Sequence, residues 1–362
     1  MLKIPNIPYT AGPCPELLAS AGTALPPRVM AFCPLDAQYL VAGTDRVEAS
    51  GAREGTLDLF RHDGRSQKLE RVSSTATGAA VLDIKFMGSM PWIFASAHSD
   101  GRVCFWYVNT DMFPLRNPEL MLLSTTAVGE GDALVTSLCF SPHNDDVMSV
   151  TLSTGELKIL DVPTGAVMLT KALPVFRECR PHKSAAYTSA FDSSRRGLVY
   201  TGGEDSSVRA YDIRMPKFAW RNPRAHPAGV TALMPLWGES TSATLWTGSY
   251  DGTVRVWDTS YAGYAMACGA AFEQGIEMGG GVWKFVPHEA SGRVLACCMK
   301  GGARILAVDE ITYWPEVEQS ITSDGNLVYG GDWAPDGSVV GTCSFDDCQI
   351  KLWAADAPVY AR

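Results

Sequence analysis

The sequence predicts an all-β protein, a seven-bladed β-propeller, from one short motif and from its repetition. The stretch Thr247–Asp258 contains two alternating runs, a pattern typical of strands, and Asp251-Gly252 between them favours a tight turn. The second run ends in Trp257-Asp258, the dipeptide that characterises WD repeats. One such unit cannot bury its apolar face alone, so the prediction depends on whether the chain repeats it.

The motif recurs in a constant register. A turn residue precedes an apolar anchor by six positions, as Asp251 precedes Trp257. The same spacing links Asp100 to Trp106, Asp205 to Tyr211, Asp347 to Trp353 and, with weaker signatures, Glu54 to Phe60, Thr154 to Leu160 and Lys300 to Leu306. Successive anchors lie 46, 54, 51, 46, 49 and 47 residues apart. WD repeats span roughly 40–45 residues, and more with loop insertions, so the sequence predicts seven of them.

Seven repeats account for nearly the whole chain as one domain over residues 28–362. The blades are expected near 28–72, 81–126, 134–171, 182–221, 226–270, 279–321 and 327–356. Only nine residues follow Trp353, the anchor of the last blade. The Pro- and Ala-rich N-terminal segment 1–27 is therefore expected to supply the outer strand of the last blade and to close the ring.

Charge and hydropathy exclude several classes of function. The net charge is −9 with no run of like charges, which argues against nucleic acid as the main partner because phosphate binding needs a basic surface. No apolar run approaches the roughly 18 residues of a membrane span. Prolines interrupt the N-terminus at Pro5, Pro8, Pro13 and Pro15, so the sequence shows no signal-peptide core.

The ten cysteines indicate reduced thiols rather than disulfides. None forms a Cys-x-x-Cys pair, and half of them lie within predicted strands, namely Cys104, Cys139, Cys297, Cys298 and Cys343. Buried thiols of this kind are typical of a cytoplasmic protein.

Generic catalytic motifs are absent from the sequence. It contains no Gly-x-Ser-x-Gly, no His-Glu-x-x-His, no phosphate-binding loop and no dinucleotide fingerprint. The propeller alone therefore favours a non-catalytic scaffold that binds partner proteins through its top face, although a fold does not determine a function.

Two histidines have structural and catalytic interpretations. His226, Ser249, Asp251 and Trp257 are the residue types of the hydrogen-bonded tetrad of a WD blade, and we interpret them as structural. His182 precedes blade four and pairs with Asp205 by the same logic. That blade lacks the Ser of the tetrad and has Tyr in place of Trp, so a catalytic role for His182 stays open.

Charged residues on the predicted inner strands mark a further candidate site. Aligned on the aromatic residue that follows each of them, Lys284 in blade six and Asp332 in blade seven occupy equivalent places, where most WD repeats have a small residue. One interpretation is a structural ion pair that closes the ring. The other is a polar site at the channel mouth, in which Asp332 acts as a general base or orients one.

Several stretches are more specific than the propeller pattern. They are Ala80–Phe86 (Ala-Val-Leu-Asp-Ile-Lys-Phe), Tyr200–Asp205 (Tyr-Thr-Gly-Gly-Glu-Asp), Gly280–Trp283 (Gly-Gly-Val-Trp), Leu327–Trp333 (Leu-Val-Tyr-Gly-Gly-Asp-Trp) and Thr342–Asp347 (Thr-Cys-Ser-Phe-Asp-Asp). In this order and spacing the chain resembles the WD-repeat diphthine methyl esterase family of the diphthamide pathway. The likeness covers all seven blades and is strongest in blades four to seven.

The resemblance implies an enzyme. Members of this family hydrolyse the methyl ester of methylated diphthine on translation elongation factor 2, giving diphthine for later amidation to diphthamide. Older names for the family describe a methyltransferase. The sequence shows no glycine-rich S-adenosylmethionine loop between a strand and a helix, so hydrolysis without a cofactor is expected. Elongation factor 2 would then be the protein partner, and the cytoplasm the compartment.

The chain departs from the family pattern at the entry to blade four. The family has a Glu shortly after the His of this entry, whereas here Ala185 stands at that position after His182. If the Glu is the base, another group must replace it, and Asp332 and His182 are the catalytic candidates. Ser344 is a weaker candidate nucleophile, because a serine on a strand is more often structural.

The substrate of this reaction carries a trimethylammonium group, which aromatic rings bind through cation–π attraction. Trp283, Tyr329 and Tyr187 are therefore expected near the channel as substrate-binding residues, together with Lys284. Asp332 is the expected carboxylate partner of the cation. No metal-ligating constellation is evident in the sequence.

Overall fold

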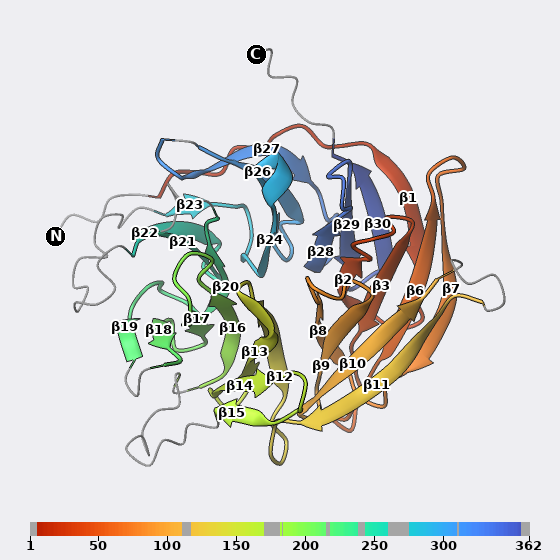
Figure 1. Cartoon of the computed structure of the whole chain (residues 1–362). Helices are drawn as coiled ribbons and strands as arrows, with labels where there is room; N and C mark the ends of the chain where they lie inside the picture. Colours follow the sequence, from red (N-terminus) through yellow and green to blue (C-terminus); the bar gives the residue numbers. More distant parts are fainter. Residues whose placement is uncertain are drawn as a thin grey trace.

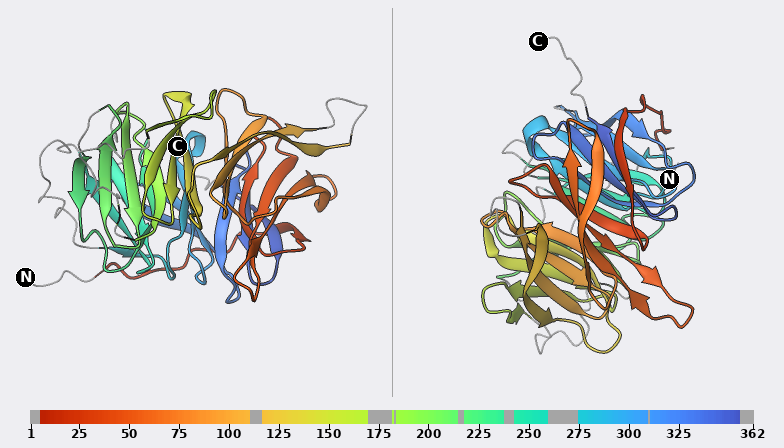
Figure 2. Two further views of the ribbon diagram at one scale, coloured as in Figure 1. Left: turned by 90° about the horizontal axis from the view of Figure 1, so that it is seen from below. Right: turned by 90° about the vertical axis from the view of Figure 1, so that its right-hand side faces the viewer.

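The computed structural model describes residues 6–110, 117–169, 182, 184–214, 218–237, 243–259, 275–309 and 311–355. In these residues the chain forms seven four-stranded antiparallel sheets, arranged as blades around a central axis (Figure 1). Seen from the side, the ring of blades is a disc (Figure 2). The predicted fold class, an all-β seven-bladed WD-repeat β-propeller, is confirmed.

Each blade runs from an inner strand at the axis to an outer strand at the rim. Blade one contains β2 (Pro27–Phe32), β3 (Tyr39–Thr44), β6 (Thr56–Asp63) and β7 (Lys68–Ala76), with the small hairpin β4 (Arg46–Val47) and β5 (Arg53–Glu54) in its middle turn. Blade two contains β8 (Val81–Phe86), β9 (Ile93–His98), β10 (Arg102–Asn109) and β11 (Glu119–Ala127). Blade three contains β12 (Val135–Ser141), β13 (Asn144–Leu152), β14 (Leu157–Asp161) and β15 (Val167–Leu169).

The remaining blades repeat this order. Blade four contains β16 (Ala186–Phe191), β17 (Leu198–Gly203), β18 (Val208–Asp212) and β19 (Phe218–Asn222). Blade five contains β20 (Val230–Pro235), β21 (Thr244–Ser249), β22 (Thr253–Asp258) and β23 (Ile276–Glu277). Blade six contains β24 (Lys284–His288), the 3₁₀ turn η2 (Glu289–Ser291), β25 (Arg293–Cys297), β26 (Ala303–Val308) and β27 (Pro315–Ile321). Blade seven contains β28 (Val328–Trp333), β29 (Val339–Ser344), β30 (Gln349–Ala354) and, from the N-terminus, β1 (Leu17–Gly22).

The N-terminal segment ties the last three blades together. β1 pairs antiparallel with β30, from Leu17 opposite Trp353 to Gly22 opposite Gln349. Before it, Ile7 accepts a hydrogen bond from the backbone of β23, and Pro13 accepts one from the backbone of β27. The segment therefore runs along the rim past blades five and six before it closes blade seven (Figure 1).

The core lies between neighbouring blades. In one buried cluster, Val41 and Leu59 of blade one pack against Ile84, Phe94 and Trp106 of blade two. The predicted anchors all lie in the third strand of their blades, and all of them except the half-buried Tyr211 are shielded from water. This explains the apolar, mostly aromatic character of the repeat position.

A hydrogen-bonded chain fastens the turn of blade five to its strands, but one predicted member is wrong. The ring of His226 bonds Asp251 at 2.9 Å through Nδ1 and Thr247 at 2.7 Å through Nε2. Trp257 Nε1 donates to the same Thr247 hydroxyl at 2.8 Å. Ser249 instead donates to the Ala228 carbonyl. The central hydroxyl of the tetrad is thus Thr247. Both residues point to the same face of β21, but Trp257 lies opposite Leu245, so Thr247 is its diagonal neighbour and Ser249 lies two residues further away, at the turn.

Candidate active site

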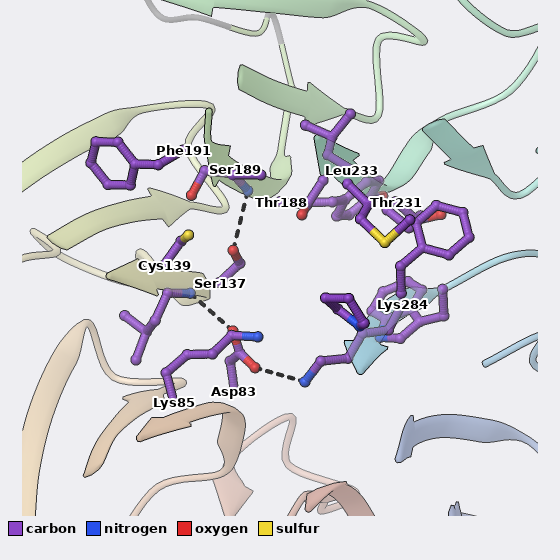
Figure 3. A pocket seen from close by; sticks show the side chains of 18 of the residues that line it. Asp83, Lys85, Ser137, Cys139, Thr188, Ser189, Phe191, Thr231, Leu233 and Lys284 are labelled. Carbon is purple, nitrogen blue, oxygen red and sulfur yellow. Dashed lines mark hydrogen bonds and ion pairs between the residues drawn. The ribbon is translucent and has the colours of Figure 1, made fainter. Parts of the chain in front are cut away.

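The inner strands enclose a cavity of about 300 Å³ on the propeller axis (Figure 3). This volume lies at the lower end of the range for small-ligand pockets. Its upper mouth, where the inner strands begin, is lined by Arg28, Tyr187, Trp283 and Tyr329. Beyond the mouth, the charged lining residues are Asp83, Lys85 and Lys284, together with the exposed Glu289 of η2.

The aromatic residues of the upper mouth form one continuous cluster around Trp283. Its ring centroid lies 5.1 Å from that of Tyr329, 5.8 Å from that of Tyr250 and 6.1 Å from that of Tyr187. Tyr187 and Tyr250 meet edge to face at 5.7 Å, and Phe345 extends the cluster beyond Tyr329 at 5.4 Å. The structure thus brings together the three aromatic residues expected near the channel and adds Tyr250 and Phe345.

The aromatic cluster already holds a cation of the chain itself. The guanidinium carbon of Arg28 lies 5.3 Å from the Trp283 ring centroid and 5.1 Å from that of Tyr329. Arg28 is kept there by Asp45, whose buried carboxylate also binds Arg53 at 2.8 Å. Gly330 permits this arrangement, since a Cβ atom at that position would come within 2.7 Å of the Arg28 carbonyl oxygen.

Carboxylates surround the same aromatic cluster. Burial, and then the charge of Glu204, raises the pKa of the Tyr187 hydroxyl. Burial likewise raises the pKa of Tyr329, with contributions from Asp346 and Asp45 that Arg28 opposes. Aromatic faces bordered by negative charge favour an organic cation.

Lys284 forms an ion pair, but not with Asp332. Its Nζ lies 3.1 Å from Oδ1 of Asp83 in blade two, across the channel. Burial lowers the pKa of Lys284, but the attraction of Asp83 outweighs it and the pKa lies above the usual value. Burial would raise the pKa of Asp83, yet Lys284 and Lys85 hold it below its usual value. Both groups are therefore charged at neutral pH.

The predicted equivalence of Lys284 and Asp332 is wrong by two residues. Lys284 lies opposite Cys297 in the strand pairing of blade six. The residues at the same register position are Asp83 in blade two, opposite Ala97, and Gly330 in blade seven, opposite Cys343. Asp332 pairs with Gly341, which is the position of Lys85 in blade two. The sequence alignment failed because it used the aromatic residue as its reference. In blade six Phe285 stands two positions earlier than Trp333 does in blade seven.

Asp332 lies outside the lining of the cavity and ties two blades together. Its Oδ2 accepts a hydrogen bond from the backbone N–H of Phe32 in blade one at 2.8 Å. Asp83 does the same for blade three, accepting from Leu138 at 3.0 Å. Burial raises the pKa of Asp332, although the Phe32 and Trp333 N–H groups and Lys284 oppose the shift.

His182 is fully buried within blade four. Its Nδ1 lies 2.7 Å from Asp205 and its Nε2 lies 3.0 Å from the Thr201 hydroxyl, which replaces the missing Ser of the tetrad. Burial, partly offset by Asp205, lowers the pKa of the ring. Since both nitrogens are engaged and the ring does not line the cavity, the expectation that His182 serves as the base is wrong.

Ser344 is also buried, at 2% exposure, and its hydroxyl finds no hydrogen-bond partner among the described residues. It does not line the cavity, so its position does not support a role as nucleophile.

The sequence interpretation missed Arg28, Asp83 and Lys85. The only signal for Lys85 was a charge at an inner-strand position that is apolar in most blades.

The described part of the chain holds no cluster of three or more His, Cys, Asp or Glu side chains placed to bind a metal. Its eight described cysteines are all free thiols. No helix in the described ranges has the length and apolarity needed to cross a membrane.

Comparison with known proteins agrees with this architecture. A family model for the WD domain, G-beta repeat, matches residues 221–258 and 317–354. A Saccharomyces cerevisiae protein named diphthine methyltransferase is 28% identical over 93% of this chain and 98% of its own length. A Schizosaccharomyces pombe protein of the same name is 27% identical over 91% of this chain and 95% of its own length.

Among solved structures, a chain from the crystal structure of the mitotic checkpoint complex matches with a TM-score of 0.68. The match covers 95% of this chain and 93% of that one, and at 17% identity it shows the fold alone. The resemblance first identified from sequence motifs is confirmed by relatives that align over nearly their full length. The chain is therefore similar, over nearly its full length, to WD-repeat proteins named diphthine methyltransferase.

Proposed function

We propose that this protein is an enzyme of diphthamide biosynthesis that hydrolyses the methyl ester of methylated diphthine. Its substrate would be translation elongation factor 2, met in the cytoplasm. The names of the relatives point to diphthine and to its methyl group. Hydrolysis acts on that same group with water as the only co-reactant.

The aromatic cluster at the upper mouth is the observation that carries this proposal. Methylated diphthine presents a trimethylammonium group, which needs aromatic faces and a nearby negative charge. Trp283 and Tyr329 already pack against the guanidinium group of Arg28, which supports the proposal that this cluster favours cations. The exposed carboxylate of Glu204 beside Tyr187 supplies negative charge on the side of the cluster away from Arg28.

The reaction needs a base for water and a donor for the developing oxyanion. Asp332 remains our candidate base, since a raised pKa makes its carboxylate a better proton acceptor. Its side chain is half-buried, whereas those of His182 and Ser344 are buried, so Asp332 would act on a water molecule held between itself and the ester. The water oxygen bonds to the carbonyl carbon, and its proton passes to the carboxylate. The bond to the methoxy oxygen then breaks, and methanol leaves with that proton.

The decisive experiment incubates elongation factor 2 carrying methylated diphthine with the purified protein and follows the modified peptide by mass spectrometry. We expect the loss of one CH₂ unit of mass without any added cofactor. A parallel reaction offers unmethylated diphthine and S-adenosylmethionine. A gain of one CH₂ unit there, with no loss in the first reaction, would establish methyl transfer instead. No change in either reaction would favour the non-catalytic scaffold.

Trp283→Ala should raise KM about tenfold or more, because a desolvated cation–π contact is worth up to ~2 kcal/mol.

Asp332→Asn should abolish turnover while the protein stays folded. The matched control is Asp336→Asn, an exposed carboxylate in the turn after the same inner strand. Equal activity of both Asn variants would remove Asp332 from the mechanism.

A further inference from the structure

Lys85 is a charged side chain in the cavity to which no role has yet been given. It lies near the end of β8, and the equivalent positions of five other blades hold Ala31, Cys139, Ala190, Met234 and Val286. An ammonium group there is not needed to build a blade, since small or apolar residues suffice. Figure 3 shows the Lys85 side chain directed into the cavity beside Asp83.

The ammonium of Lys85 makes no direct hydrogen bond or ion pair among the described residues, although its charge acts on Asp83 together with that of Lys284. The carboxylate of Asp83 cannot fully neutralise the Lys85 ammonium, because both of its oxygens already accept hydrogen bonds from other groups. Oδ1 of Asp83 accepts from Lys284 at 3.1 Å and from its neighbour Ile84 at 3.0 Å, and Oδ2 accepts from Leu138 at 3.0 Å. A half-buried ammonium that faces a cavity, and whose neighbouring carboxylate is already hydrogen-bonded to other groups, attracts a further anionic group.

Hydroxyl donors lie on the neighbouring wall of the cavity. Ser137 accepts the backbone N–H of Ser189 at 3.2 Å, which leaves its own hydroxyl hydrogen free to donate. Thr188 lines the cavity as well, and its hydroxyl has no partner in the described ranges. A cation and hydroxyl donors that line one cavity can together stabilise a carboxylate or a tetrahedral oxyanion.

We infer that Lys85 is a catalytic residue that binds the ester carbonyl of the substrate and the carboxylate of the product, while the aromatic cluster of the upper mouth binds the trimethylammonium group. This inference deepens the proposed function and rests on it. It assigns the substrate class as a trimethylammonium compound whose ester or carboxyl group reaches past the mouth into the cavity. When water adds to the carbonyl carbon, the electron pair of the broken π bond moves to the oxygen facing Lys85.

The first test compares Lys85→Met, Lys85→Gln and Lys85→Arg with the wild type in the ester hydrolysis assay. Loss of an oxyanion donor costs about 10²-fold or more in kcat and leaves KM within a few-fold. Lys85→Arg should restore part of the rate because it keeps the charge. Methionine and valine occupy this register position in other blades, so Lys85→Met is expected to fold, which circular dichroism checks. Lys68→Met, on the exposed outer strand of blade one, is the matched control.

The inference is overturned if folded Lys85→Met and Lys85→Gln keep kcat within about twofold of the wild type. It is supported if kcat falls in both variants, recovers in Lys85→Arg and is unchanged in Lys68→Met. A rise in KM alone would also overturn it, because that pattern belongs to uniform ground-state binding.

The second test does not depend on turnover and separates this inference from the proposed function. Calorimetry measures the binding of glycine betaine, which has a trimethylammonium and a carboxylate, and of choline, which lacks the carboxylate. The wild type should prefer betaine, and Lys85→Met should lose that preference while it still binds choline. If the wild type removes no methyl group, the proposed function fails, and this binding preference alone decides the role of Lys85. Equal preference in wild type and Lys85→Met would reject it.

Discussion

At the scale of single residues, the pairing register of the strands decides which hydroxyl joins a WD tetrad. Three tryptophans donate from Nε1 to a hydroxyl on the neighbouring strand: Trp106 to Ser96, Trp257 to Thr247 and Trp353 to Thr342. In each case the hydroxyl lies two residues beyond the residue directly opposite the Trp, on the same face of the sheet. Ser249 lies two residues further along that face, beyond reach of Trp257, which is why its predicted role was wrong.

Thr247→Val should therefore destabilise the protein more than Ser249→Ala. Valine has the same shape but leaves both the His226 ring and the Trp257 indole buried without a partner, at a cost of about 2–3 kcal/mol. Ser249→Ala removes one bond of 3.3 Å to a carbonyl and one accepted from Asp251, about 1 kcal/mol. Urea unfolding of both variants measures the difference. A larger loss in Ser249→Ala would contradict the observed tetrad.

The charges of the cavity could be predicted only in part. An inner-strand Lys at 284 was recognisable because most blades have small or apolar residues nearby. Its partner Asp83 lies about two hundred positions earlier in the chain and in a blade that is not adjacent. Only closure of the ring brings the two together, so no local pattern could have paired them.

At the scale of elements, the N-terminal segment is the main closing device. β1 covers the free edge of β30, and Ala19 is buried in the cluster that contains Leu352 and Phe60. The segment before it covers the short outer strand β23 and part of β27. An uncovered strand edge would leave its backbone groups unpaired and prone to pairing with other chains.

Deletion of residues 1–22 should lower the melting temperature by several degrees and promote concentration-dependent association. The deletion removes a whole strand from blade seven and exposes the edge of β30. Deletion of residues 1–5 is the control, because it leaves every one of these contacts in place. Thermal unfolding and light scattering at two protein concentrations give the readout. A monomeric 1–22 deletion with an unchanged melting temperature would show that the strand is dispensable.

At the scale of the whole molecule, buried neutral histidines make stability depend on pH. Burial lowers the pKa of His98 to about 4, and burial also lowers the pKa values of His182 and His226 despite their aspartate partners. In the unfolded chain these rings take up protons at their usual pKa near 6.5. Between the two values the unfolded state binds more protons, so stability is fully present above the usual pKa and is lost as the pH falls. Asp332, with a raised pKa, opposes this trend.

The free energy of unfolding should therefore fall between pH ~7 and ~5, by up to about 1.4 kcal/mol per pH unit for each affected histidine. Urea unfolding at several pH values measures the slope. His98→Gln should flatten it, because glutamine can bond Ser96 without titrating. His143→Gln, at an exposed position, should leave the slope unchanged. A slope unaffected by His98→Gln would contradict the assignment.

The sequence by itself determined the number of blades, the repeat register and the family resemblance. These properties follow from local sequence patterns, namely a turn, an alternating strand and an anchor residue at a constant spacing. It also pointed to Trp283, Tyr329 and Tyr187, which the fold gathers at one mouth of the channel. Only the tertiary structure decided which charges meet and which hydroxyl completes a tetrad. Contacts across the channel depend on closure of the ring, which brings distant blades together. They also depend on the strand register, because a charged residue two positions further along an inner strand lies at a different depth in the channel.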